Sequence, residues 1–417
     1  MMLSRFTPRH ALLAAVLGAA LAGCGGSDDT TTAPPSRVQQ AADRAVQQGL
    51  VGVALAHVTP SETDEGIAGV RKAGSADPVR RDDWFLLGSN TKAMTASIAA
   101  RLVERGAIAW TTTLAEALPD LAPNMREAYR TVTLEQLLNH RGGVMAFNNE
   151  ADVQAFWSYL ETLGTVRPST LADRQRLLAA WWLAQPSPAD VTPGRDFSYS
   201  NAGYALVAMM LEARTGLAFR DLFDQELIRP LGMEVRWVQA DEAAVDRPSG
   251  HAGAAGQAPT VIAPLTAEEA LWSEVIRPAG PDFAIRATSY AQWVRWHLRA
   301  LQGHATPLAA SYVQRLQAVK AGDYAMGWAA IQLPDRRPAL VHAGEWGGFN
   351  SEAVIDQTGR SGSLALTNIV TSDNGDSWVL ALLDMALLDI ETHLPPVPEH
   401  RDQPGPLYRV GARSLRH

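Results

Sequence analysis

Residues 85–92 read Phe-Leu-Leu-Gly-Ser-Asn-Thr-Lys, an apolar strand that runs through Gly88 into a segment led by Ser89. Apolar side chains then recur at helical spacing: Met94, Ile98, Ala99 and Leu102. This pattern predicts a helix over 89–105 that ends at the following glycine. Because residues three apart lie on one face of a helix, Lys92 can reach the hydroxyl of Ser89.

The pair Ser89 and Lys92 has the residue types that nucleophilic catalysis needs. A serine hydroxyl is a poor nucleophile until a neighbouring base takes its proton. The helix N-terminus adds a positive dipole end near the position where an oxyanion would develop. Lysine occurs only at Lys72, Lys92 and Lys320, which makes a lysine-containing motif informative in this chain. The structural alternative is a helix cap with a solvated lysine.

A second candidate is Tyr199-Ser200-Asn201, which follows a turn rich in proline, glycine and aspartate and leads into a helix. A phenol has a pKa near 10. A nearby lysine cation could lower that pKa, so that Tyr199 becomes a phenolate base that relays the serine proton. The amide of Asn201 could orient Lys92 or donate to a substrate carbonyl. The structural alternative is a helix-capping loop with a packed aromatic ring.

The third candidate is His342-Ala343-Gly344, which leads out of an apolar strand. Small residues at a strand edge let a substrate lie against the backbone. The amide N–H of Glu345 could then join that of Ser89 in an oxyanion hole, and His342 would supply a positive or hydrogen-bonding group. The same tripeptide at His251-Ala252-Gly253 is interpreted as part of a loop between helical segments, with His251 structural or incidental.

These three motifs, in this order, resemble the serine hydrolase family that includes class C β-lactamases, D-alanyl-D-alanine carboxypeptidases, D-amino-acid peptidases and related esterases. The resemblance extends from about Ser36 to Leu388 and is supported by four flanking segments: Phe85–Gly88, Leu137–His140, Pro230–Met233 and Tyr324–Trp328. It implies that Ser89 is acylated, that Lys92 and Tyr199 manage protons, and that Asn201 holds the network. His342 then takes the place of the lysine or histidine of the third motif.

The order of elements is strands, then helices, then strands and a closing helix, which predicts an α/β fold of the α+β type. We expect an antiparallel β-sheet flanked by helices, with an inserted, mostly helical domain, as in β-lactamases and transpeptidases. The predicted sheet domain covers residues 36–106 and 276–395, and the helical domain covers 107–275. Residues 396–417 form a tail.

The N-terminus resembles a lipoprotein signal. A basic start precedes the apolar run from Ala11 to Ala20, which is too short to span a bilayer comfortably. Leu21-Ala22-Gly23-Cys24 resembles a lipobox, so 1–24 is predicted to be a signal peptide with Cys24 lipidated, and 25–35 a flexible tether. We expect an exported protein anchored on the periplasmic side, in the outer membrane if the host is Gram-negative. The alternative is a plain cleaved signal.

Two departures from the family pattern bear on the substrate. Ala343 has no hydroxyl where relatives that bind a carboxylate often carry Thr or Ser, and losing a donor to a charged partner costs about 1.5–3 kcal/mol. Glu345 would disfavour anionic substrates further. Small esters or amides are therefore favoured. A penicillin-interacting D-Ala-D-Ala carboxypeptidase or weak class C β-lactamase is the alternative, and an idle binding lipoprotein is a third. His140 is interpreted as a satisfied loop histidine.

Other function classes receive no support from composition. The formal net charge of −8 and the absence of a clustered basic face argue against nucleic-acid binding. No His, Cys, Asp or Glu cluster has metal-ligand spacing, so we expect neither a metal nor another cofactor. A Gly-x-Ser-x-Gly elbow is absent, which argues against an α/β-hydrolase. The sequence makes no prediction about oligomeric state.

Overall fold

The computed structural model describes residues 34–164, 167–238, 246–372 and 377–392. The predicted signal segment 1–24 with Cys24, residues 25–33 of the tether and the tail 396–417 lie outside these ranges. From Ser36 onward the described chain belongs to one compact unit. The division into a sheet domain and a helical domain stays a prediction.

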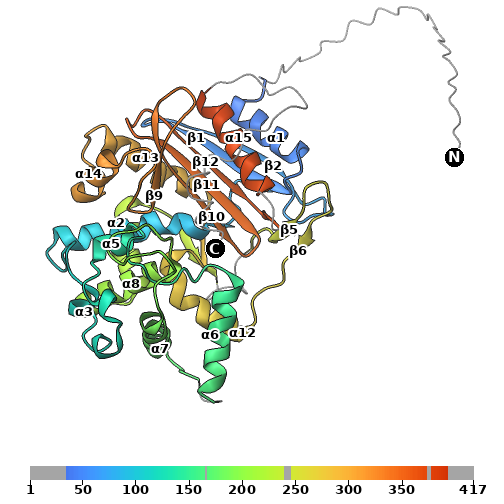
Figure 1. The fold of residues 1–417 in the computed structure, drawn as a ribbon. Helices are drawn as coiled ribbons and strands as arrows, with labels where there is room; N and C mark the ends of the chain where they lie inside the picture. The colour runs from blue at the N-terminus through green and yellow to red at the C-terminus, as the bar shows by residue number, and fades with distance from the viewer. Residues whose placement is uncertain (1–33, 165–166, 239–245, 373–376, 393–417) are drawn as a thin grey trace, which may run out of the picture. The chain divides into compact units, whose positions relative to one another are not determined.

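A seven-stranded antiparallel sheet joins the two ends of the described chain, as the sequence predicts (Figure 1). Its order is β2-β1-β12-β11-β10-β9-β8, and β1 pairs with β12 through partners such as Val53 and Thr367. The strands are β1 (Gly52–Val58), β2 (Thr63–Gly69), β8 (Tyr324–Ala325), β9 (Trp328–Gln332), β10 (Pro338–Trp346), β11 (Phe349–Asp356) and β12 (Gly362–Thr367).

Helices cover both faces of this sheet. One face packs against α1 (Arg37–Gln47) and α15 (Trp378–Thr392), and the other packs against α13 (Ala287–Leu301). The alternation along β11 explains this arrangement, since Val354 belongs to the core under α1 and α15 while its neighbours Ala353 and Ile355 belong to the larger core on the opposite face. Both faces of the sheet are therefore buried.

The remaining helices form a second layer (Figure 1). Within it, α2 (Thr91–Glu104) packs against other helices of the layer and is buried almost all round. None of the helices within the described ranges is both long and apolar enough to cross a bilayer. The helices of this layer are α3 (Leu114–Ala117), α4 (Glu127–Arg130), α5 (Leu134–Leu138), α6 (Glu150–Thr162), α7 (Leu171–Ala184), α8 (Asn201–Thr215), α9 (Phe219–Phe223), α10 (Arg229–Leu231), α12 (Ala267–Ser273) and α14 (Ala310–Ala318).

Two small sheets flank the large one, and the second corrects a prediction. One joins β3 (Phe85–Leu86), β7 (Phe283–Ile285) and β4 (Val235–Trp237). The other joins β5 (His251–Gly253) to β13 (Ile369–Thr371) and β6 (Thr260–Val261). The interpretation of His251 as a loop residue is wrong, because parallel pairing with β13 makes its segment a strand. Its ring is structural: Nε2 accepts the Ala73 N–H, and Nδ1 lies 2.8 Å from the Asn368 carbonyl oxygen.

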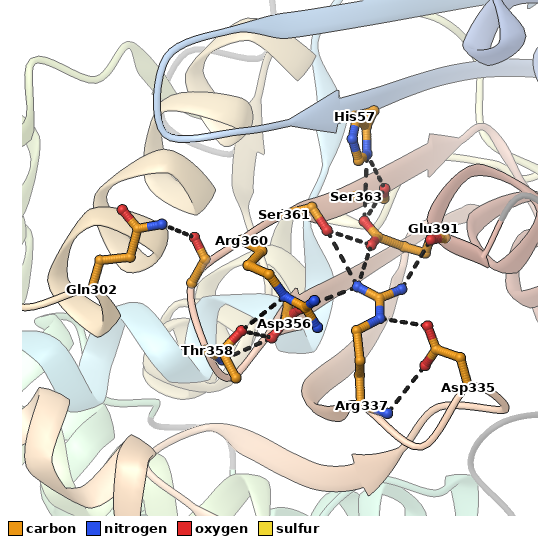
Figure 2. Close-up of polar contacts among 11 residues, drawn as sticks. His57, Gln302, Asp335, Arg337, Asp356, Thr358, Arg360, Ser361, Ser363 and Glu391 are labelled. Carbon is orange, nitrogen blue, oxygen red and sulfur yellow. Dashed lines mark hydrogen bonds and ion pairs between the residues drawn. The ribbon is translucent and has the colours of Figure 1, made fainter.

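A buried polar cluster ties the end of α15 to the β11–β12 turn (Figure 2). We call Arg337, Asp356, Ser361, Ser363 and Glu391 the α15 network. Arg337 donates to the Asp356 carboxylate and to the Glu391 carbonyl oxygen, and Ser361 and Ser363 donate to the Glu391 carboxylate. Burial acts to raise the pKa of Glu391, but hydrogen bonds from His57, Ser363 and Ser361 outweigh it and leave that pKa lowered.

Candidate active site

Ser89 lies where β3 passes into α2, in a single 3-10 turn at Gly88–Asn90. Gly88 has φ +56°, and a Cβ there would lie 2.4 Å from the Glu345 amide nitrogen. A Cβ at Gly344 would lie 2.8 Å from the Ser89 amide nitrogen. Glycine is required at both positions because the backbone of β10 lies directly against the Ser89 segment. This contact places the amides of Ser89 and Glu345, the pair predicted to form an oxyanion hole, on adjoining backbone segments.

Buried hydrogen bonds from β11 hold the Ser89 segment against β10. Ser351, the β11 partner of Gly344, donates to the Leu87 carbonyl oxygen at 2.5 Å. Its hydroxyl accepts from the Asn90 side chain at 2.7 Å. Since the single Ser351 proton goes to Leu87, the amide nitrogen of Asn90 must face Ser351. The residues on both sides of Ser89 are therefore tied to β11.

Lys92 is fully buried, and its amine makes three polar contacts. It donates to the Asn201 amide oxygen at 2.8 Å and to the Ala279 carbonyl oxygen at 2.7 Å, and it lies 3.0 Å from Ser89 Oγ. The Asn201 nitrogen donates to the Phe147 carbonyl oxygen, which turns the amide oxygen towards Lys92. A neutral amine has two N–H groups and one lone pair. With both N–H groups held by carbonyl-type acceptors, the lone pair is left for the Ser89 hydroxyl.

The charge state of Lys92 follows from its surroundings. Burial lowers its pKa well below the ordinary value. Within the described ranges no carboxylate forms an ion pair with it, so no negative charge opposes the effect of burial. The structure therefore favours a neutral amine that can accept the Ser89 proton.

Tyr199 reaches Ser89 from the segment just before α8. Ser200 caps that helix by accepting the Gly203 N–H, and Tyr199 Oη donates to Ser89 Oγ at 2.8 Å. The expectation that a lysine cation lowers the phenol pKa is wrong, because burial raises the pKa of Tyr199. Tyr199 is a neutral hydrogen-bond donor to Ser89 Oγ in this arrangement.

The third motif lies on β10 beyond the part that pairs with β9, which ends at Val341. His342 is buried; its Nδ1 lies 2.7 Å from the Ala343 carbonyl oxygen, and its Nε2 lies 3.0 Å from Tyr324 Oη. Burial is the largest cause that lowers the pKa of His342, to about 3. Of the two roles predicted for His342, a positive group or a hydrogen-bonding group, the geometry supports the second.

The structure thus brings Ser89, Lys92, Tyr199 and Asn201 into one hydrogen-bonded cluster, with His342 beside it. Sequence reasoning missed the Ala279 carbonyl and Ser351, which only the folded chain places there. The Leu137–His140 segment belongs to the family pattern, but from the sequence it predicts only a satisfied loop histidine at His140. Among the residues described, no group of three or more His, Cys, Asp or Glu side chains is placed to hold a metal ion.

A family model described as Beta-lactamase matches residues 36–384 of this chain. The chain belongs to the beta-lactamase family. Its fold, predicted from the sequence as β-lactamase/transpeptidase-like, and its assignment as a serine hydrolase are both confirmed by this membership and by the relatives it has.

Three relatives illustrate the range of this beta-lactamase family. Penicillin-binding protein 4 of Amycolatopsis lactamdurans is 30% identical over 76% of this chain and 80% of its own length. Esterase EstB of Burkholderia gladioli is 30% identical over 39% of this chain and 40% of its own length. The crystal structure of D-amino acid amidase from Ochrobactrum anthropi SV3, complexed with L-phenylalanine amide, has a TM-score of 0.64 at 20% identity and covers 86% of this chain and 98% of its own.

Proposed function

We propose that this protein hydrolyses small esters or amides through an acyl-enzyme formed on Ser89. The observation that carries the proposal is the set of contacts around Lys92: two carbonyl-type acceptors hold its N–H groups, and Ser89 Oγ lies 3.0 Å from the same nitrogen. A buried neutral amine at that distance is a general base for the serine hydroxyl.

The reaction then follows from the positions of these groups. As Ser89 Oγ attacks the substrate carbonyl, Lys92 takes the hydroxyl proton, and the amides of Ser89 and Glu345 donate to the oxyanion. Tyr199, whose hydroxyl forms a hydrogen bond to Ser89 Oγ, passes a proton to the leaving group and is reprotonated by Lys92. The bond to the leaving group breaks, and the acyl group stays on Ser89. A water molecule then attacks the acyl carbonyl carbon and gives one proton to the same groups. The bond from that carbon to Ser89 Oγ breaks, the proton passes to Ser89 Oγ, and the acid is released.

The third motif favours substrates without a carboxylate. Ala343 offers no hydroxyl, and His342 is neutral and occupied by Tyr324. A carboxylate beside β10 would therefore meet neither a cation nor a hydroxyl from these two residues. The similarity to an esterase and to a D-amino acid amidase supports uncharged esters and amides as the substrate class.

A second candidate is a cell-wall peptidase that reacts with penicillin. The similarity to penicillin-binding protein 4 along most of the chain favours it. A β-lactam and a D-Ala-D-Ala peptide both present a carboxylate, so the third motif argues against efficient action on either. Acylation by a penicillin probe, compared with turnover of a p-nitrophenyl ester, separates the two activities.

We also propose that Cys24 carries the lipid of an exported lipoprotein, on the resemblance of residues 21–24 to a lipobox. The predicted location is the periplasmic side of the cell envelope, with residues 25–35 as the tether. Expression of wild type and Cys24→Ala, followed by membrane fractionation, tests this. We expect the wild type in the membrane fraction and Cys24→Ala outside it. The same distribution for both proteins would contradict the lipid anchor.

The test of catalysis is the intact mass of the purified protein after incubation with a fluorophosphonate. One adduct is expected on the wild type and none on Ser89→Ala. Ser97→Ala, which changes a fully buried serine within α2, should keep the adduct. The absence of any adduct on the wild type would contradict the proposal and would favour the idle binding lipoprotein.

A further inference from the structure

His140 encloses Tyr199 between two hydrogen bonds. The Ser198 N–H donates to the His140 carbonyl oxygen at 2.7 Å, and the Ser200 N–H donates to His140 Nδ1 at 3.0 Å. One residue therefore fixes the backbone on both sides of Tyr199. To do so, His140 adopts φ +55°, a left-handed conformation that is uncommon outside glycine.

The imidazole of His140 also supports the Tyr199 ring. The two ring centroids are 4.2 Å apart, with an interplanar angle of 36°. The rings of Tyr204 and Tyr324 lie 5.1 and 4.8 Å from the same imidazole, which is 1% exposed. Tyr199 is thus held by its backbone and by its ring, and its Oη has little freedom to leave Ser89.

The hydrogen bonds also fix the protonation of His140. Because Nδ1 accepts the Ser200 N–H, it carries no proton, and the neutral ring bears its proton on Nε2. Burial is the largest cause that keeps the pKa of His140 well below the ordinary value. Nε2 is buried and has no hydrogen-bond partner within the described ranges. A buried donor without a partner lowers the free energy of unfolding. The contacts of His140 with the Tyr199 segment therefore account for a histidine at this position better than a contribution to stability does.

We propose that His140 is a positioning residue for acyl transfer: it holds Tyr199 so that its Oη stays within hydrogen-bonding distance of Ser89 Oγ. The expected effect on acyl transfer rests on the proposed function, whereas the effect of His140 on the position of Tyr199 does not. His140 does not contact the reacting atoms. It acts through Tyr199, because a displacement of about 1 Å at a proton-transferring group can cost roughly 10²-fold in rate.

The matched variants are His140→Asn and His140→Gly. Both residues tolerate a left-handed φ, but only asparagine carries an oxygen that can replace Nδ1 as acceptor for the Ser200 N–H. We expect His140→Gly to lower kcat for a p-nitrophenyl ester by about 10²-fold with little change in KM. His140→Asn should retain kcat within about tenfold of wild type. The fluorophosphonate labelling rate of Ser89 should follow the same order.

A control separates positioning from loss of stability. His297 is an equally buried histidine with two ring hydrogen bonds, far along the chain in α13. His297→Asn should lower the unfolding temperature without changing kcat. If His140→Asn and His140→Gly lose activity equally, or only in proportion to their loss of stability, the positioning role is overturned.

A crystal structure of His140→Gly tests the geometry without any activity. We expect Tyr199 Oη to move out of hydrogen-bonding distance of Ser89 Oγ, and the His140→Asn structure to keep the 2.8 Å contact. An unmoved Tyr199 in the glycine variant would overturn the inference. A wild type that no fluorophosphonate labels would instead contradict the proposed function, and the displacement of Tyr199 would still decide the role of His140.

Discussion

The catalytic cluster and the α15 network are both buried and polar, but their charges are paired differently. In the α15 network, Arg337 lies against Asp356 and Glu391, so opposite charges meet (Figure 2). In the catalytic cluster, Lys92 contacts an amide oxygen, a carbonyl oxygen and a hydroxyl, and its amine lies over the rings of two tyrosines; no carboxylate of the described residues forms an ion pair with it. Hydrogen bonds and ion pairs keep the network acids ionised, whereas burial drives Lys92 to its neutral form.

This difference separates a structural site from a chemical one. A paired buried charge holds two elements together, and removing one partner lowers the free energy of unfolding. An unpaired buried base lowers the free energy of unfolding, and it keeps a lone pair ready for a proton. Substitutions in the two regions should therefore change stability in opposite directions, and those in the catalytic cluster should also lower activity.

The largest effect is expected from Lys92→Met. The variant loses the base, so kcat/KM for an ester should fall by about 10⁴-fold, the upper end for a positioned proton acceptor. Its unfolding temperature should rise, because methionine carries no amine that must be buried without its charge. Lys320→Met, which changes an exposed lysine, should alter neither quantity. A Lys92→Met protein that unfolds more easily than wild type would remove the contrast between the regions.

Arg337→Met should produce the opposite result in the α15 network. Removing one partner of a buried ion pair takes Arg337 away from the carboxylates of Asp356 and Glu391, and it should lower the free energy of unfolding by about 3–5 kcal/mol. Because the network lies away from Ser89, kcat measured on the folded fraction should not change. Arg360→Met is the control: Arg360 also pairs with Asp356 but is 61% exposed, so its loss should cost under about 1 kcal/mol. Chemical denaturation with parallel ester assays checks both.

Much of the fold could be predicted because its signals are local. The apolar run of β1, the strands around the β11–β12 turn and the spacing in α2 each follow from neighbouring residues, and the family motifs lie within them. The strand at His251 could not be predicted in this way. Three residues carry no periodicity, and β5 exists only because β13, far along the chain, pairs beside it.

The site residues could be named from the sequence, but their protonation could not. The pKa of Tyr199 and the pKa of Lys92 depend on how completely the folded chain excludes water, which no motif encodes. The role of His140 was missed for a similar reason. Its two contacts with the Tyr199 segment depend on a left-handed backbone, and nothing in the residues around it specifies that conformation.

The pH dependence of stability should report Lys92 directly. Its folded-state pKa lies below its unfolded value near 10.5, so between the two values the unfolded chain binds the extra proton. Wild-type stability should then rise with pH in this window, by up to about 1.4 kcal/mol per unit. In Lys92→Met that contribution is absent. The stability advantage of the variant should therefore shrink from pH 8 to pH 10, as measured by urea denaturation. An advantage that stays constant would mean that Lys92 is charged in the folded protein.

His342 should show the same sign on a smaller scale. Its folded-state pKa is about 3, and its unfolded value is near 6.5. Below pH 6.5 His342 binds a proton in the unfolded chain but not in the folded one, so the free energy of unfolding falls as pH falls. His342→Asn should remove this loss and be relatively more stable at pH 5 than at pH 7.5, by up to about 2 kcal/mol. His304→Asn, at an exposed histidine, should show no such gain. A gain in both variants, or in neither, would mean that His342 is not held neutral, and the catalytic cluster would then contain a charge that its hydrogen bonds do not explain.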